Sequence, residues 1–206
     1  FDIPIIGIPG TIDNDLAGTD FTIGYDTAIN TVVDAVDKIR DTAESHDRLF
    51  VIEVMGRDSG LIALRSGIST GAEAVLIPEL EVDYNSILDR LEKTRKNKAS
   101  RIIIVAEGDD EGGLVVADRI KERYPHYDVR VSILGHIQRG GKPSCMDRVL
   151  ASRLGVAAVE GLLKGRRGEM AGLIHGEVQY TPFSKAIKHI DVINTNLTRI
   201  VEILSL

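Results

Sequence analysis

Short runs rich in β-branched residues alternate along this chain with longer segments of helical period. The runs that predict strands cover residues 3–8, 49–54, 74–77, 101–106 and 128–134. The segments that predict helices, with apolar residues at three- and four-residue steps, cover residues 22–40, 60–69, 85–96, 114–124 and 146–163. This repeated order favours right-handed crossovers and a mostly parallel sheet flanked by helices. The sequence therefore predicts a Rossmann-like α/β fold.

The pattern weakens beyond residue 168. There it predicts a strand near residues 171–174, then a polar turn and one or two short helices up to residue 206.

Charge balance and aromatic content exclude several kinds of partner. The 206 residues include 31 acidic and 25 basic side chains, and the formal charge of −6 argues against attraction to phosphate backbones or anionic lipids. With no tryptophan, five tyrosines and four phenylalanines, the chain has little material for stacking nucleic-acid bases. We therefore expect neither a nucleic acid nor a membrane as a partner.

Other features of the sequence favour the cytoplasm. No apolar run approaches the roughly 20 residues of a membrane-spanning helix, and no signal peptide opens the chain. Cys145 is the single cysteine, so no internal disulfide can form. We therefore expect a cytoplasmic protein.

Polar, glycine-containing segments follow four of the predicted strands. They cover residues 10–15, 55–57, 107–110 and 135–141. Ligands of open α/β sheets bind beyond the carboxyl ends of the strands, so we expect these segments to converge on one rim. Each segment alone is also typical of an ordinary polar turn, and it is their joint placement that indicates a site.

The acidic residues of these segments suit proton transfer and cation binding. Asp13 and Asp15 are separated by one residue, so one can act as a general base while the other holds a divalent cation. The alternative is that both bond nearby backbone amides, as turn aspartates often do. An ionised Glu107 only accepts hydrogen bonds and suits sugar hydroxyls.

Cationic residues of the chain provide a candidate phosphate pocket. Guanidinium groups bind phosphate through paired hydrogen bonds, although each arginine alone is as readily explained by a surface ion pair and the histidine by a structural role. The candidates are Arg48, Arg57, Arg130, His136 and Arg139. Together with the carboxylates they indicate phosphoryl transfer to a hydroxylated, phosphorylated small molecule. The chain contains neither a G-x-x-x-x-G-K-[ST] nor a G-x-G-x-x-G loop to hold the donor phosphates.

Three motifs also carry a family resemblance. In chain order they are Pro9-Gly10-Thr11-Ile12-Asp13-Asn14-Asp15, Met55-Gly56-Arg57 and Leu134-Gly135-His136-Ile137-Gln138-Arg139-Gly140-Gly141. In order and approximate spacing they resemble the motifs of the bacterial-type ATP-dependent 6-phosphofructokinases. The resemblance covers roughly residues 3–165. It implies part of the phosphofructokinase fold and, with Mg²⁺, the glycolytic transfer of a phosphoryl group from ATP to the 1-hydroxyl of fructose 6-phosphate.

The resemblance implies a role for each residue of the site. Asp13 would be the base that accepts the hydroxyl proton, and Asp15 would serve the magnesium ion. Arg57 would stabilise the transferring phosphoryl group, Thr11 would contact the substrate, and Gly10 would lie beside the donor. The residues lining the sugar phosphate pocket would be Met55, Gly56, Glu107, His136 and Arg139.

Two further sets of residues resemble family positions. Arg48 and Arg130 resemble arginines that reach the 6-phosphate across a subunit interface, which implies a homo-oligomer, a tetramer in this family. A nucleotide effector would bind at Arg40, Gly71, Glu73, Lys96 and Lys98. For Arg40 the alternative is a cation that complements a helix carboxyl end.

The chain departs from the family pattern at its amino-terminal side, since the ATP-binding portion with its glycine-rich segment is absent before residue 1. We therefore expect residues 1–20 to be a remnant of the nucleotide-side domain. Residues 21–174 would form the substrate-binding α/β domain, and residues 175–206 a carboxy-terminal segment. Taken alone, the chain is expected not to turn over.

Two other functions compete with this prediction. Pyrophosphate-dependent relatives typically carry a lysine where this chain has Gly10, so Gly10 favours ATP as the donor. A non-catalytic sugar-phosphate-binding module gains nothing from a general base, so Asp13 favours an enzyme.

Overall fold

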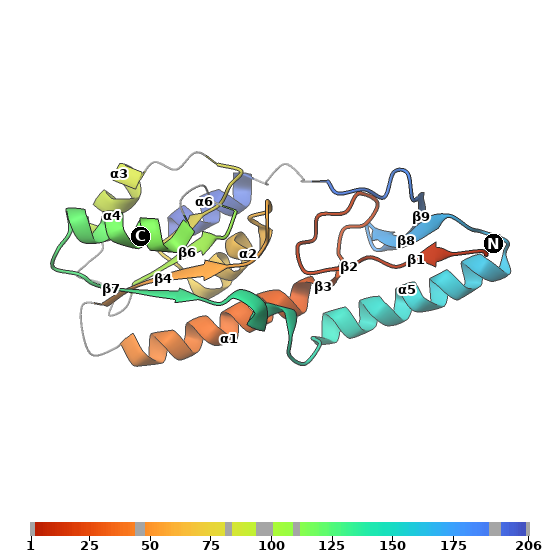
Figure 1. The fold of residues 1–206 in the computed structure, drawn as a ribbon, viewed down its shortest axis with the longest axis horizontal. Helices are drawn as coiled ribbons and strands as arrows, with labels where there is room; N and C mark the ends of the chain where they lie inside the picture. The colour runs from red at the N-terminus through yellow and green to blue at the C-terminus, as the bar shows by residue number, and fades with distance from the viewer. Residues whose placement is uncertain are drawn as a thin grey trace. The chain divides into compact units, whose positions relative to one another are not determined.

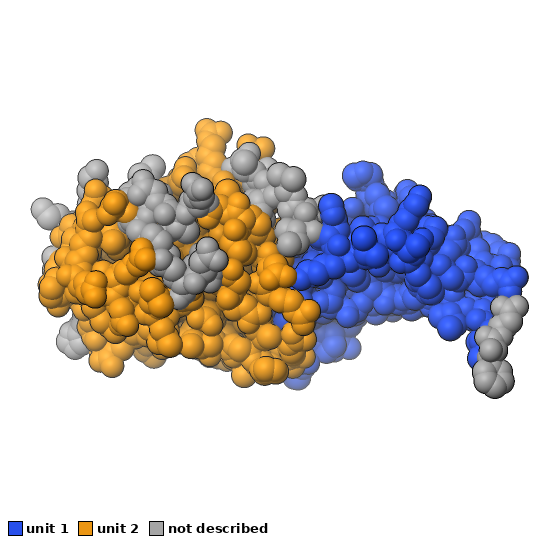
Figure 2. Space-filling view, turned by 45° about the horizontal axis from the view of Figure 1, so that its top comes forward, with its two compact units in different colours: residues 1–28, 141–191 blue, residues 29–140, 192–206 orange. Residues whose placement is uncertain are grey.

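The computed structural model describes residues 3–43, 48–80, 84–93, 101–108, 112–189 and 195–204. The chain forms two compact units, each built from segments distant in sequence (Figure 2). Unit 1 contains residues 1–28 and 141–191, and unit 2 contains residues 29–140 and 192–206. The domain boundaries predicted after residues 20 and 174 concern the roles of the three predicted segments, and they stay a prediction.

A four-stranded parallel sheet forms the centre of unit 2 (Figure 1). Its strands, in spatial order, are β5 (Ala74–Leu76), β6 (Arg101–Ala106), β4 (Arg48–Val54) and β7 (Asp128–Ile133). All six residues of β6 are buried, which is typical of a central parallel strand covered on both faces. The predicted α/β fold with a mostly parallel sheet is confirmed.

Helices cover the two faces of this sheet. Unit 2 contains α2 (Leu61–Thr70), α3 (Tyr84–Lys93), α4 (Gly112–Arg123), α6 (Thr195–Leu204) and most of the helix Tyr25–Ala43. Helices α3 and α4 pack on the face that carries Leu49, Val51 and Ile103. Successive strand residues point to opposite faces, so the fully buried Ile52 and Ile104 must be covered by helices on the other face of the sheet. Helix α2 covers that face by packing on β5 and β6, and α6 packs against α2.

Unit 1 has a smaller mixed sheet. Strand β8 (Glu169–Ile174) pairs in parallel with β1 (Ile6–Gly7) and antiparallel with β9 (Glu177–Pro182). Helix α5 (Cys145–Leu163) packs on this sheet, and Leu150, Leu154 and Leu173 form the core between them.

A short pair of strands and a long helix lead from unit 1 to unit 2. Strands β2 (Gly10–Thr11) and β3 (Ile23–Gly24) form a short parallel pair. Helix α1 (Tyr25–Ala43) starts directly after β3 and continues into unit 2. None of the helices in the described ranges is both long and apolar enough to cross a membrane.

The predicted helices are confirmed with ends shifted by a few residues, except that residues 94–96 of the predicted helix 85–96 lie outside the described residues. The predictions for residues 3–8 and for the segment after residue 174 are wrong in part. Within the predicted buried strand 3–8, only Ile6 and Gly7 pair, and Ile3 and Ile5 are exposed, because β1 contacts a single neighbouring strand in the described sheet. Strand β9 lies where a polar turn and helices were expected. His175 and Gly176, both with positive φ, form the two-residue turn between β8 and β9, and a histidine there is a weaker hairpin signal than Asn-Gly.

Candidate functional site

Three of the four polar segments follow strands of the unit 2 sheet. Residues 55–57 follow β4, 107–108 follow β6, and 135–139 follow β7, all at the carboxyl end of a parallel strand. For these three, convergence on one rim is confirmed. The expectation that residues 10–15 extend the same rim of one sheet is wrong, because the strand before them pairs with β8 in unit 1.

The turn after β4 depends on a glycine. Gly56 has a φ of 156°, and a Cβ atom built on it would lie 2.4 Å from the carbonyl oxygen of Ser59. The amide of Ser59 donates to the carbonyl of Gly56 at 2.9 Å, which closes the turn. Any side chain at position 56 would therefore push this turn open.

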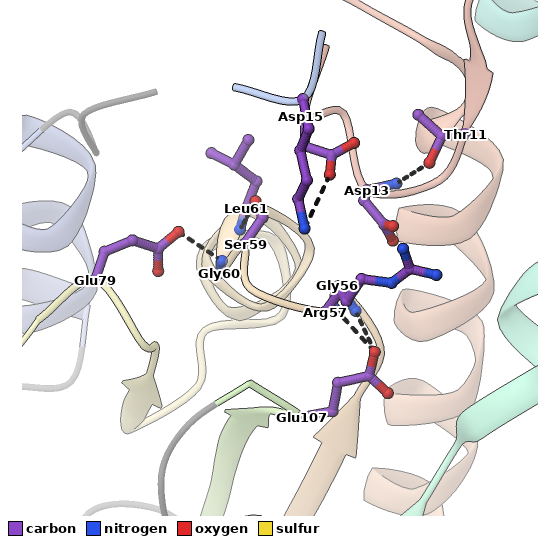
Figure 3. Close-up of polar contacts among 11 residues, drawn as sticks. Thr11, Asp13, Asp15, Gly56, Arg57, Ser59, Gly60, Leu61, Glu79 and Glu107 are labelled. Carbon is purple, nitrogen blue, oxygen red and sulfur yellow. Dashed lines mark hydrogen bonds and ion pairs between the residues drawn. The ribbon is translucent and has the colours of Figure 1, made fainter. Parts of the chain in front are cut away.

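Glu107 holds the same turn from the neighbouring strand (Figure 3). Its Oε1 atom accepts hydrogen bonds from the backbone amides of Gly56 at 3.3 Å and Arg57 at 2.9 Å. Arg57 itself is exposed and has a φ of 56°, a left-handed conformation that is uncommon for a residue with a side chain. One carboxylate oxygen of Glu107 thus holds the backbone at Gly56 and Arg57 in place.

Gln138 connects the third segment to this turn, and no pattern in the sequence indicated this contact. It lies in the 3₁₀ helix η1 (Gly135–Arg139), is 1% exposed, and accepts a hydrogen bond from the amide of Met55 through Oε1 at 2.8 Å. Its neighbours His136 and Arg139 are exposed. The structure therefore brings to the carboxyl rim of unit 2 the predicted residues Met55, Gly56, Arg57, Glu107, His136 and Arg139.

Arg48 lies at the opposite end of the same sheet, and Arg130 lies midway along β7, opposite Phe50 of β4. Arg48 is the first residue of β4, and Arg130 follows the first residue of β7, Asp128, by two positions. Asp128 pairs with both, at 3.5 Å from Arg48 Nε and 2.9 Å from Arg130 Nε. Arg48 lies six residue steps before Val54, or about 20 Å, and Arg130 lies three steps before Ile133, or about 10 Å. A single-chain pocket that joins Arg48 to Arg57, His136 and Arg139 is therefore ruled out by strand length, whereas Arg130 lies closer to the rim.

The motif turn of unit 1 buries two carboxylates. Asp13 is 6% exposed and Asp15 is 7% exposed. The amide of Asp13 donates to Oγ1 of Thr11 at 3.2 Å, so the threonine at the start of the turn fixes the backbone of the aspartate (Figure 3). Buried ionisable groups are uncommon unless a structure or a reaction requires them, and this supports the choice of these aspartates as site residues.

Lys188 also contacts the turn, and sequence reasoning missed it. Its Nζ atom lies 3.6 Å from Oδ2 of Asp15, and the amide of His189 donates to the carbonyl of Asp15 at 2.7 Å. Residues 187–189 thus run beside residues 15–17, joined also by the bridge between Leu16 and Lys188. No local pattern links positions so far apart in the chain.

Two carboxylates of the turn, Asp13 and Asp15, are the candidates for holding a divalent cation. Among the described residues, no group of three or more His, Cys, Asp or Glu side chains could hold a metal ion. Mg²⁺ usually takes only one or two carboxylates and completes its shell with water and substrate phosphates. Asp13 and Asp15 could supply these carboxylates.

Gly10, at the start of the turn, is open to substitution. It is exposed, and no heavy atom of the described residues lies within 4 Å of a Cβ atom built on it. Neither its φ nor its surroundings require a glycine.

Residues expected at an effector site fall at the end of α2. The guanidinium of Arg40 donates to the carbonyl of Thr70, next to Gly71, whose φ of 62° ends the helix. Glu73 is buried, and its Oε2 atom accepts from the amide of Ile102 at 2.6 Å. Arg40 lies in the last turn of α1, where a cation complements the carboxyl end of the helix, as the alternative explanation required. It also lies beside Gly71. Lys96 and Lys98 lie outside the described residues.

Comparison with known proteins identifies the relatives of this chain. A family model described as phosphofructokinase matches residues 1–162. An ATP-dependent 6-phosphofructokinase 2 of Bacteroides thetaiotaomicron is 54% identical over 208 residues, covering 100% of this chain and 64% of that protein. An ATP-dependent 6-phosphofructokinase of Cytophaga hutchinsonii is 58% identical over 204 residues, covering 98% of this chain and 62% of that protein. The chain thus spans less than two thirds of the length of these curated relatives.

A solved structure gives the same result for the fold. Phosphofructokinase from Saccharomyces cerevisiae superposes with a TM-score of 0.84 at 33% sequence identity, over 89% of this chain and 26% of that one.

Proposed function

This chain belongs to the phosphofructokinase family, and on that basis we propose that it forms part of an enzyme that phosphorylates fructose 6-phosphate. ATP gives its terminal phosphoryl group to the 1-hydroxyl of the sugar, and the product is fructose 1,6-bisphosphate. The observation that carries the proposal is the motif turn of unit 1, in which Asp13 and Asp15 are buried carboxylates on a backbone fixed by Thr11. Relatives at 54% and 58% identity are named as enzymes of this activity.

Each residue of the proposed site has a distinct part in the transfer. Asp13 accepts the proton of the 1-hydroxyl as the oxygen attacks the phosphoryl group. Arg57 offsets the charge that spreads over the phosphoryl oxygens. Asp15, with Asp13 beside it, would hold Mg²⁺, which when bound neutralises the donor phosphates. Thr11 contacts the substrate and keeps the turn in shape.

The carboxyl rim of unit 2 is the proposed sugar phosphate pocket. Its members are Met55, Gly56, Glu107, His136 and Arg139, and the bonds from Glu107 and Gln138 support it by fixing the turn after β4. Arg48 and Arg130 act on the substrate of a neighbouring copy in a homotetramer. The position of Arg48 at the far end of β4 supports this assignment, because within one chain it lies away from the rim.

The donor and the regulation are also part of the proposal. Exposed, open Gly10 leaves room for a nucleotide and supports ATP over pyrophosphate. Arg40, Gly71 and Glu73 contribute to a site for a nucleotide effector. The enzyme works in the cytoplasm, where glycolytic intermediates occur.

The substitution Asp13→Asn tests the central assignment. It is made in a polypeptide of the relatives' length that contains this sequence, called the full-length enzyme below. Asparagine keeps size and polarity but accepts no proton, so kcat should fall by about 10²- to 10⁴-fold. The dissociation constant for fructose 6-phosphate, measured by calorimetry, should stay within about threefold.

A matched variant controls for the loss of charge. Asp37→Asn makes the same change on the exposed surface of α1 and should leave kcat unaltered. An Asp13→Asn enzyme with turnover within about threefold of the parent would refute the proposal. A parent that binds the sugar phosphate but forms no product would instead indicate a binding module.

A further inference from the structure

We propose that Asn14 and Thr22 are positioning residues that together hold the carboxylate of Asp13 in place for catalysis. The inference rests on the proposed function, since it presumes that Asp13 is the base. It starts from four hydrogen bonds that tie the motif turn to the segment preceding α1.

Thr22 bonds to the turn on both sides of Asp13. Its hydroxyl donates to the carbonyl of Thr11 at 2.7 Å and lies 3.2 Å from Oδ1 of Asn14. Its backbone amide donates to the same Oδ1 atom at 2.7 Å. Only Ile12 and Asp13 lie between the two anchored residues, so this short stretch has little freedom to shift.

Asn14 adds a third anchor. Its Nδ2 atom donates to the carbonyl of Asp20 at 3.1 Å. Its φ of 53° is a left-handed conformation that asparagine tolerates better than most residues. A carboxamide can donate and accept at once, which a carboxylate cannot, and it adds no third negative charge between Asp13 and Asp15. The chemistry of asparagine therefore fits this position in three respects.

The anchoring segment is itself fixed. Thr22 is 1% exposed, and its carbonyl accepts from the amide of Tyr25 in the first turn of α1. The amide of Ile23 donates to the carbonyl of Pro9 at 3.0 Å. The amide of Gly24 donates to Oδ1 of Asp147, in the first turn of α5, at 2.9 Å. The two positioning residues thus transmit the rigidity of unit 1 to the turn.

Position matters here because a general base must stay within hydrogen-bond reach of the proton it accepts. A displacement of about 1 Å can lower a rate by about 10²-fold. Loss of the Thr22 hydroxyl would release the Thr11 carbonyl, and loss of the Asn14 carboxamide would release the other side of Asp13. Both changes should affect kcat more than substrate binding.

The test compares Thr22→Val with Thr22→Ser in the full-length enzyme. Valine keeps the branched shape but lacks the hydroxyl, so kcat should fall by about 10- to 100-fold while KM for fructose 6-phosphate stays within about threefold. Serine keeps the hydroxyl and should restore most of kcat. A purely structural role would lower the melting temperature without this split between kcat and KM. Equal kcat losses in both variants, or no loss in valine, would overturn the proposal.

Asn14→Gly keeps the test decisive if valine prevents folding. Glycine adopts the φ of position 14 without strain but has no carboxamide, so the variant should fold and show the same selective loss of kcat. Normal kcat in Asn14→Gly would overturn the proposal. Asp13→Asn, assayed in parallel, separates the two claims. If it is inactive while Asn14→Gly and Thr22→Val are normal, only the positioning role fails, and if it is active, the proposed function fails.

Discussion

The carboxylate of Glu107 accepts a hydrogen bond from the backbone amide of Arg57 at 2.9 Å. The two strands that precede these residues, β6 and β4, are neighbours in the parallel sheet, and the bond joins the turns that follow them. The contact is close, because a Cβ atom built on Gly108 would lie 1.9 Å from the carbonyl oxygen of Arg57. Glu107 therefore determines where the backbone of Arg57 lies, whatever else it binds.

Substitutions at Glu107 should reveal which property of this side chain matters. Glu107→Ala removes the acceptor and should raise KM for fructose 6-phosphate about 10- to 100-fold, because two amides of the turn lose a charge-assisted bond. Glu107→Gln keeps an acceptor oxygen and should cause a clearly smaller increase. Steady-state kinetics of both variants decide the matter. Equal damage would show that the negative charge, rather than the bond to the turn, is what the substrate requires.

The left-handed backbone of Arg57 leads to a stability prediction. Arg57→Ala and Arg57→Gly both remove the guanidinium and should both abolish most turnover. Only glycine tolerates the φ of 56°, so Arg57→Gly should be more stable than Arg57→Ala by about 1 kcal/mol. Urea unfolding of the two variants measures the difference.

An exposed helical site provides the opposite control. At Lys38 of α1, alanine should be more stable than glycine by about 1 kcal/mol, because glycine is unfavourable within a helix. The same order of stability at both positions would contradict the strained backbone at Arg57.

Gly10 provides a test of the phosphoryl donor. The parent enzyme should use ATP in preference to pyrophosphate. Gly10→Lys should fold normally, because the position is open, but should lower kcat/KM for ATP by at least about tenfold as the new side chain occupies the space of the nucleotide. Gly155→Lys adds the same charge at another open glycine, on α5, and should leave ATP use unchanged. A parent that prefers pyrophosphate, or a Gly10→Lys enzyme with normal ATP kinetics, would contradict the assignment.

Asp147 should be a main source of stability in unit 1. Its carboxylate is 2% exposed and accepts from the amides of Gly24 at 2.9 Å and Thr27 at 2.8 Å, and from the Thr27 hydroxyl at 2.5 Å. Asp147→Asn would face these donors with an amide group, and unfolding free energy should fall by about 2–4 kcal/mol. Ser144→Ala removes the cap of α5 and should lose only about 1 kcal/mol. Similar losses in the two variants would contradict the role given to Asp147.

The sequence was informative where neighbouring residues determine structure. Strands and helices of unit 2 were predictable because period and β-branching are local properties, and β9 was missed because His175 lacks the usual turn signal. The contacts of Gln138 with Met55 and of Lys188 with Asp15 join residues far apart in the chain, so no local pattern indicates them. The predicted pocket combined both arginine groups because it was chosen by residue type, although the predicted strand 49–54 already separates Arg48 from Met55.

The position of Arg48 and Arg130 leads to a test of shared sites. Because Arg48 lies about 20 Å along β4 from the carboxyl rim, and Arg130 about 10 Å before the end of β7, they should act on the substrate of a neighbouring subunit. Arg130→Ala should raise KM for fructose 6-phosphate by at least about 30-fold, the effect of losing one buried contact to a phosphate, while Asp13→Asn removes turnover. When the two variants are mixed and reassembled, about a quarter of the sites should combine an intact Asp13 with an intact Arg130 from another chain. The mixture should then show parent-like KM at reduced kcat. Asp13→Asn mixed with Arg57→Ala is the matched control and should gain no activity, since both residues are assigned to one chain at each site. If the Arg130→Ala mixture is no more active than the average of its components, Arg130 acts within its own subunit or not at all.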